Sequence, residues 1–153
     1  MNTPTEYPSL SAYITVKDAS KAIDFYKAAF GAEELFRLTM PGSTTVGHAE
    51  LKIRGTLLML SEEFPGMNKS PLTLGDTPVT FCLIVEDADA AFAQAVEAGA
   101  RAERAVADQF YGFRSGCVVD PSGHRWMIQH ETEKLTPEQM QERMGNCADS
   151  SAA

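Results

Sequence analysis

The sequence contains few cysteines, and their spacing is irregular. It has three, Cys82, Cys117 and Cys147. Disulfide frameworks use an even number of cysteines, and zinc knuckles use closely spaced pairs. The pattern therefore excludes both classes and predicts reduced thiols in a cytoplasmic protein.

Long apolar runs and positive charge are also scarce. The apolar run Leu57–Leu60 is far shorter than the roughly 20 residues that cross a bilayer, and no charged-then-apolar leader follows Met1. We therefore expect neither a membrane span nor secretion. Lys and Arg number 13 against 21 Asp and Glu, a net charge of −8. This balance argues against a nucleic-acid partner or an anionic membrane surface.

The sequence does contain one stretch twice. Val16–Gly31 reads as a strand end, an aspartate cap, an amphipathic helix and a glycine stop, and Val85–Gly99 repeats this order. Asp18 and Asp87 fit the position that caps the first turn of a helix. A glycine just past each helix suits the left-handed conformation there. Two copies at this distance indicate two half-domains that pair, since solenoid repeats are shorter.

The segments around each helix repeat as well. Alternating apolar and polar residues predict one strand before each helix and three strands after it. Gly55-Thr-Leu-Leu-Met-Leu aligns with Gly123-His-Arg-Trp-Met-Ile, so that Met59 corresponds to Met127. Two β-α-β-β-β modules follow from this pattern, and the 153 residues suit one domain made of two halves.

The predicted boundaries divide the chain into four parts. The first module covers residues 10–61 and the second covers 79–130. The stretch 62–78, rich in Pro and Gly, is predicted to be a linker that also suits a lid. Thr136-Pro-Glu-Gln has the form of a capping box, which predicts a short helix over 136–145. The small and polar residues 146–153 are expected to be disordered.

These motifs together resemble the vicinal oxygen chelate superfamily, which includes glyoxalase I and bleomycin-resistance proteins. The resemblance rests on Val16-Lys-Asp, Phe30-Gly and Asp120-Pro-Ser-Gly-His-Arg-Trp. Tyr111-Gly-Phe-Arg and His48-Ala-Glu-Leu resemble its PhnB-like branch in particular. The resemblance implies an α+β fold in which two paired modules form a curved mixed sheet with helices on the convex side. It also implies a homodimer.

The resemblance also identifies the positions that hold a divalent metal in metal-dependent members. In this sequence those positions carry Ser11, Met59, Thr80 and Met127. Two thioethers and two neutral hydroxyls are poor ligands for zinc, nickel or iron. We therefore expect no metal cofactor and no glyoxalase I reaction, because fold alone does not specify chemistry.

Strand alternation predicts which side chains line the inner face of the sheet. That face is mixed polar and apolar, as small-molecule clefts are, and Tyr13 and Gln129 are candidate ligand-binding residues. The alternative is that large side chains fill the cup. The inner-face positions are Ser11, Tyr13, Thr15, Met59, Thr80, Cys82, Met127 and Gln129.

His48 and Glu50 lie two residues apart on one predicted strand and so face the same way. Such a pair suits an acid–base role or a metal site. A zinc site needs at least three protein ligands, and no third is evident. We therefore favour a polar pocket wall or a solvated face, continued by Lys52, over a metal site.

The segment 108–114 carries three aromatic side chains and an arginine, at the start of a predicted strand. Phe110 and Tyr111 could stack on a ligand at the cleft mouth, and Arg114 could pair with an anionic group. Equally, the segment is a structural loop whose arginine pairs with a neighbouring carboxylate.

Three functions fit these observations. The first is a metal-independent protein that binds a small molecule in a concave cleft. The second is a metal-dependent lyase, isomerase or dioxygenase that uses His48 and Glu50. The third is a structural or regulatory partner protein.

Overall fold

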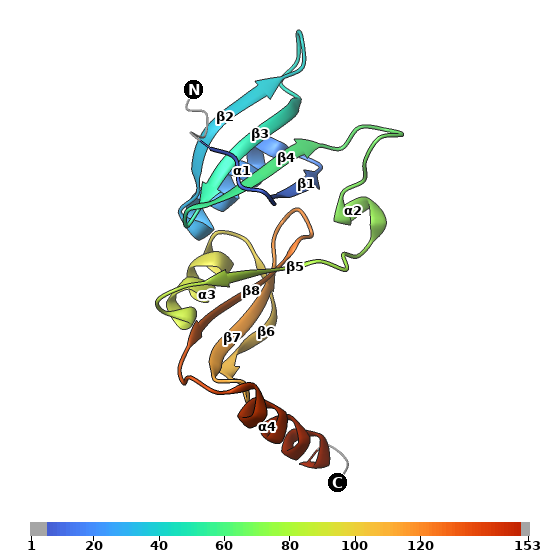
Figure 1. Cartoon of the computed structure of the whole chain (residues 1–153). Helices are drawn as coiled ribbons and strands as arrows, with labels where there is room; N and C mark the ends of the chain where they lie inside the picture. Colours follow the sequence, from blue (N-terminus) through green and yellow to red (C-terminus); the bar gives the residue numbers. More distant parts are fainter. Residues whose placement is uncertain (1–5, 151–153) are drawn as a thin grey trace.

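The computed structural model describes residues 6–150, except for the side chains of residues 148–150. Strands β1 to β4 and helix α1 form the first module, and β5 to β8 and α3 form the second (Figure 1). Short helix α2 lies between the modules in sequence, and α4 follows the second. The bounds are β1 Ala12–Val16, α1 Ala19–Phe30, β2 Glu33–Thr39, β3 Val46–Ile53, β4 Thr56–Glu62, α2 Pro71–Leu74, β5 Thr80–Ile84, α3 Ala88–Glu97, β6 Arg101–Asp108, β7 Phe113–Val119, β8 Arg125–Glu131 and α4 Pro137–Ser150.

Each module contains one four-stranded mixed sheet. The strand orders are β1-β4-β3-β2 and β5-β8-β7-β6, with the first pair of each sheet parallel and the others antiparallel. The same topology in both modules confirms the α+β fold with two paired β-α-β-β-β units. The strands form two sheets rather than one that is continuous across the modules.

Local sequence signals define both long helices. The Asp18 carboxylate accepts from the N–H of Lys21 at 3.0 Å, and Asp87 accepts from the N–H of Ala90 at 3.1 Å. Gly31 ends α1 with φ of 65°, a left-handed conformation that a glycine adopts without steric cost. The aspartate caps confirm the prediction for both helices, and Gly31 confirms the glycine stop of α1. The predicted left-handed stop at Gly99 was wrong, because Ala98 caps α3 in a right-handed conformation and Gly99 follows with φ of 121°.

Each helix covers one face of its sheet with apolar side chains. Along α1, Ala22, Ile23 and Tyr26 are buried against Ile14, Leu51 and other strand residues. We call the opposite face of each sheet its open face. Tyr13, at 52% exposed, lies on the open face of the first sheet, whereas the flanking Ile14 is 4% exposed. Alternation along the strands therefore separates core from open face as predicted.

The modules meet through α1, α3 and the turn between β7 and β8. Asp120, 4% exposed, accepts from the Tyr26 hydroxyl at 2.7 Å and from Trp126 Nε1 at 2.9 Å. The ring centroids of Phe30 and Trp126 lie 4.6 Å apart. A buried carboxylate and stacked rings thus connect the helix of one module to the sheet of the other.

Two segments differ from the sequence-based expectation. The stretch 62–78 contains α2, because Ser70 caps it and Pro71 fills the first helical position. Helix α4 does not end near residue 145 but continues to Ser150, so residues 146–150, which were expected to be disordered, are helical. Residues 151–153 of that stretch lie outside the described residues. Its capping box is present, with Thr136 and Gln139 bonded reciprocally at 2.9 and 3.3 Å. A glycine inside a helix costs only about 1 kcal/mol, and no proline follows Gly145, so the helix passes through it.

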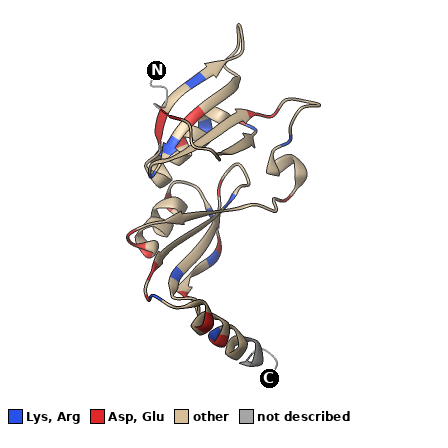
Figure 2. Ribbon diagram, viewed as in Figure 1, with Lys and Arg blue, Asp and Glu red and all other residues tan. Residues whose placement is uncertain are grey.

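Charged side chains of both signs are interspersed over both modules (Figure 2). Many of them form ion pairs, such as Arg114 with Asp89 and Arg125 with Glu103. Within residues 6–150, no helix is both long enough and apolar enough to cross a membrane.

Candidate functional site

The open face of the first sheet brings three of the predicted residues together. Tyr13 pairs with Met59 on β4, and Met59 pairs with Glu50 on β3. His48 lies two residues before Glu50 and therefore on the same face. Strand register thus gathers residues that lie far apart in the sequence.

A chain of hydrogen bonds joins these side chains. The Tyr13 hydroxyl lies 2.9 Å from His48 Nδ1, and His48 Nε2 lies 3.1 Å from Glu50 Oε1. The Tyr7 hydroxyl donates to the same Oε1 at 3.2 Å. Desolvation and the neighbouring Glu50 carboxylate raise the pKa of Tyr7, so Tyr7 remains a donor at neutral pH. We call Tyr7, Tyr13, His48 and Glu50 the tyrosine–histidine cluster.

Glu50 is the buried end of this cluster. Its side chain is 3% exposed, and its second oxygen, Oε2, is buried without a hydrogen-bond partner among the described residues. An unpartnered buried acceptor is costly. Such an unsatisfied buried oxygen calls for an explanation, and a ligand that donates to it would supply one.

The outer end of the cluster is accessible. Tyr13 is 52% exposed, and Leu38, which pairs with His48 on the neighbouring strand, is 50% exposed. The Phe36 ring lies 5.7 Å from the His48 ring. The cluster therefore runs from a buried carboxylate to exposed apolar and aromatic side chains, the mixture found in small-molecule sites.

The second sheet places Gln129 on its own open face. Gln129 Nε2 donates to Cys82 Sγ at 3.1 Å, while Gln129 Oε1 is buried without a partner among the described residues. Burial raises the pKa of the Cys82 thiol, which keeps it protonated. Cys82 pairs with Met127 as Tyr13 pairs with Met59, so the duplication places Cys82 where the first module has Tyr13.

Phe110 and Tyr111 lie in the turn between β6 and β7, close to the segment that leads into α4 (Figure 1). Their rings contact each other edge to face at 5.2 Å. Thr132 and Glu133 donate backbone hydrogen bonds to the Gly112 carbonyl oxygen. The structure thus holds this turn against the C-terminal segment and does not bring it to the tyrosine–histidine cluster.

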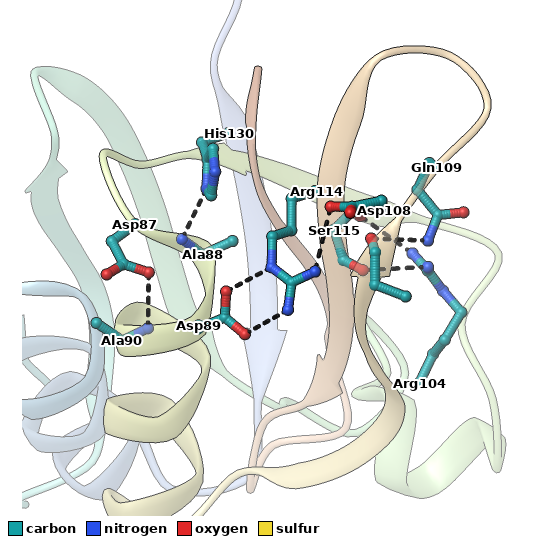
Figure 3. Close-up of polar contacts among 11 residues, drawn as sticks. Asp87, Ala88, Asp89, Ala90, Arg104, Asp108, Gln109, Arg114, Ser115 and His130 are labelled. Atoms are coloured by element: carbon teal, nitrogen blue, oxygen red, sulfur yellow. Dashed lines mark hydrogen bonds and ion pairs between the residues drawn. The ribbon is translucent and has the colours of Figure 1, made fainter. Parts of the chain in front are cut away.

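Arg114 forms the carboxylate pairs that were one of its two expected roles. Its guanidinium binds Asp89 at 2.6 and 2.9 Å and Asp108 at 3.1 Å (Figure 3). Hydrogen bonds from Arg114 lower the pKa of Asp89. Since Asp89 belongs to the first turn of α3, Arg114 is directed toward the helix-covered face of the second sheet.

The four positions that the family resemblance identifies with metal binding carry weak donors in this chain. Ser11 Oγ is buried without a partner among the described residues, Thr80 is exposed, and Met59 and Met127 are partly buried thioethers. Residues 6–150 contain no group of three or more His, Cys, Asp or Glu side chains that could hold a metal ion. This donor set does not fit a divalent metal, which prefers imidazole, carboxylate or thiolate ligands.

An open cleft of about 460 Å³ lies where the two modules meet. Its walls come from the start of β1 and from β4 and β5, with Trp126 of β8 also lining it, and they are mostly apolar. Ser11 and Cys82 are among its lining residues. Leu57 lies two residues before Met59, and Ile84 lies two residues after Cys82, so the cleft borders the open faces of both sheets.

Sequence reasoning missed two residues of these faces. Tyr7 precedes the first strand, and nothing in its neighbourhood indicates that it reaches Glu50. Arg104 lies on β6, which has irregular register on both sides of it, so alternation could not assign its face. An arginine within a weakly alternating strand was the one signal that the sequence offered.

Comparison with known proteins identifies the family. The family model of the Glyoxalase/Bleomycin resistance protein/Dioxygenase superfamily matches residues 9–128. The chain belongs to this superfamily.

Three relatives illustrate the similarity. An uncharacterized protein of Mycobacterium tuberculosis is 40% identical over 146 residues, 93% of this chain and 85% of that protein. The X-ray structure of an Arabidopsis thaliana gene product has 29% identity and a TM-score of 0.64, covering 80% of this chain and 98% of that one. The crystal structure of TioX from Micromonospora sp. ML1 has 25% identity and a TM-score of 0.64, covering 81% and 98%.

Proposed function

We propose that this protein binds a small molecule on the open faces of its sheets, without a metal. The observation that carries the proposal is Glu50, whose buried Oε2 lacks a partner while Oε1 is held by His48 and Tyr7. A hydrogen-bond donor on the ligand would satisfy this oxygen. The same proposal assigns the protein to the PhnB-like branch and to the cytoplasm. It also divides the chain into modules at residues 10–61 and 79–130, joined by the linker 62–78.

Each cluster residue has a role in the proposed complex. Glu50 accepts from an N–H or O–H group of the ligand, and His48 holds the carboxylate in place. Tyr13, half exposed, contacts the ligand with its ring and hydroxyl. Gln129 offers a second unpartnered acceptor from the other sheet. Three further residues remain predicted ligand contacts, namely Phe110, Tyr111 and Arg114. Within one protomer they do not lie beside the tyrosine–histidine cluster.

A homodimer would complete such a site. The open faces carry exposed apolar side chains on both sheets, including Leu38 at 50% and Ile84 at 54%. Apolar side chains exposed on a sheet face indicate a surface that another molecule covers. We propose that a second copy covers these faces and that the ligand lies between sheets of the two protomers. The charge of −8 supports a partner other than nucleic acid.

The alternative function is metal-dependent lyase, isomerase or dioxygenase chemistry at His48 and Glu50. It is favoured by the 3.1 Å contact between an imidazole and a carboxylate, both suitable metal ligands. Against it, both His48 ring nitrogens already have partners, and a third ligand is missing from the described residues.

Ligand screening on matched variants tests the proposal. Compounds that stabilise the wild-type protein would be titrated against Glu50→Gln and, as control, Glu97→Gln, an exposed carboxylate on α3. Loss of a bond to a charged acceptor weakens binding by roughly 10- to 100-fold, so we expect this loss in Glu50→Gln alone. Equal binding by both variants would refute the role of Glu50.

A further inference from the structure

Arg104 differs from most arginines of this protein in its partners. Its Nη2 donates to Ser115 Oγ at 3.1 Å and to Cys117 Sγ at 3.4 Å, and its Nη1 donates to the Ser115 carbonyl oxygen at 3.3 Å. All three acceptors are neutral. The arginines that instead pair with carboxylates are Arg37, Arg54, Arg114, Arg125 and Arg143.

The fold holds this guanidinium over the open face of the second sheet. Arg104 pairs with Cys117 across β6 and β7, and Ser115 and Cys117 are 0% and 9% exposed beneath it. Figure 3 shows Arg104 reaching Ser115 while Arg114 turns toward α3. The two arginines therefore serve opposite faces of the sheet, and only Arg114 is neutralised by carboxylates.

No nearby carboxylate among the described residues neutralises Arg104. Glu103, its neighbour in sequence, is held by Arg125 at 2.6 and 3.2 Å. Glu131 lies at the end of β8, opposite Phe113, and makes no ion pair with Arg104. A partly buried cation with neutral partners keeps its attraction for an anion, because little of its charge is screened by protein groups.

Hydrogen-bonding groups without partners lie on both sides of Ser115. A guanidinium has five N–H donors, and the bonds to Ser115 and Cys117 leave Nε and one Nη1 hydrogen without partners among the described residues. Across β7 and β8, Ser115 pairs with Gln129, which is 7% exposed and has an unpartnered Oε1. A cation with free donors and a buried, unpartnered acceptor thus flank the same serine.

We propose that Arg104 and Gln129 form an oxyanion subsite on the open face of the second sheet. Arg104 binds the carboxylate or phosphonate of a small molecule, and Gln129 Oε1 accepts from an adjoining N–H or O–H group. The subsite deepens the proposed function, on which it rests for the claim that the open faces bind small molecules. It makes the ligand an anion that also carries a hydrogen-bond donor.

Amide NMR titration at constant ionic strength tests this subsite. The probes are salicylate and phenylphosphonate, with the uncharged salicylamide for comparison. We expect either anion to shift the amide signals of Arg104, Ser115 and Cys117 saturably, and salicylamide to leave them unchanged. The anion whose shifts saturate at the lower concentration shows whether the subsite prefers a carboxylate or a phosphonate.

Variants separate the subsite from general charge effects. Arg104→Met should weaken binding of the anions by about tenfold or more. Lys134→Met, which removes the same charge from an exposed loop position, should leave it unchanged. Saturable shifts that persist in Arg104→Met, or no saturable shift with either anion, would overturn the proposal.

This outcome is independent of the Glu50 test. Anion binding that is lost in Arg104→Met supports the subsite even where Glu50→Gln has no effect on screened ligands. Conversely, the subsite is refuted if a ligand depends on Glu50 but neither anion shifts the amide signal of Arg104. The proposed role of the tyrosine–histidine cluster is then unaffected.

Discussion

At the scale of single residues, Asp120 and Tyr26 connect the two modules. Asp120 accepts from Tyr26, from Trp126 and from the backbone N–H groups of Ser122 and His124, at 2.7 to 3.0 Å. Burial and the Asp120 carboxylate raise the pKa of Tyr26 well above its usual value. The hydroxyl therefore stays protonated and remains a donor throughout the neutral range.

Tyr26→Phe tests this connection. Loss of a hydrogen bond to a buried charged acceptor should lower the free energy of unfolding by about 1.5–3 kcal/mol, measured by urea denaturation. Tyr111→Phe is the control, because its hydroxyl has no hydrogen bond among the described residues. Equal stability of the two variants would contradict the role of this bond.

Glu34 gives a pH-dependent prediction. Hydrogen bonds from Arg37 and Lys27 lower the pKa of Glu34 from 4.5 to about 2. Because the folded-state pKa is depressed, the stabilisation is complete above pH 4.5 and is lost as the pH falls through 2. Glu34→Gln should therefore be less stable than wild type by about 1–2 kcal/mol at pH 7, after solvent screening.

The difference between wild type and Glu34→Gln should narrow between pH 4.5 and 2, measured by chemical denaturation across that range. A difference that stays constant over the same range would mean that packing, and not the carboxylate charge, causes it.

At the scale of elements, Gly112 fixes the turn between β6 and β7 against the C-terminal segment. Its φ is +84°, and a Cβ added there would lie 2.4 Å from the Glu133 carbonyl oxygen. Gly112→Ala should therefore destabilise the protein by more than the roughly 1 kcal/mol that positive φ alone costs.

Gly66→Ala separates strain from steric overlap, since Gly66 has φ of +82° and open space around its Cβ position. In thermal unfolding we expect Gly112→Ala to lose clearly more stability than Gly66→Ala. Similar losses would show that the 109–112 turn is free to move away from Glu133.

The helices, caps and turns were predictable from the sequence only where local residues determine them. Caps, the turn at Asp120 and strand alternation are local, and each was predicted because neighbouring residues determine it. The predicted end of α4 at residue 145 was wrong. A glycine there can either end a helix or lie within it, and the outcome depends on the stability of the whole helix. Helix α2 was missed although Ser70-Pro71 is a cap signal, since prolines in that stretch favoured a linker.

The site was predictable only in part, for a physical reason. His48 and Glu50 share a face by alternation, so their proximity follows from the sequence. Contact between Tyr13 and His48, 35 positions apart, depends on the register of β1, β4 and β3. The partners of Tyr7 and Arg104 depend on chain packing and on irregular register, which no local pattern encodes.

At the scale of the whole molecule, the open faces predict self-association. Leu38→Glu places a charge on the open face of the first sheet and should shift the protein toward monomer, because burying an unpaired charge is costly. Met67→Glu, at a residue that is 84% exposed in the 62–78 segment, should have no such effect. Light scattering after size exclusion measures both. A wild-type monomer, or identical masses for the two variants, would contradict the proposed dimer.

Metal-independent binding at the tyrosine–histidine cluster is the central claim for the whole molecule. Thermal unfolding of EDTA-stripped protein, alone and with nickel, zinc, manganese or iron(II), tests it most directly. A ligand at a hundred times its dissociation constant adds about 2.7 kcal/mol, roughly 5–10 °C for a chain of this size. We predict no such shift with any metal, and a shift of that size with bound small molecules in EDTA. A metal-induced shift that His48→Ala abolishes would contradict the claim and favour metal-dependent chemistry.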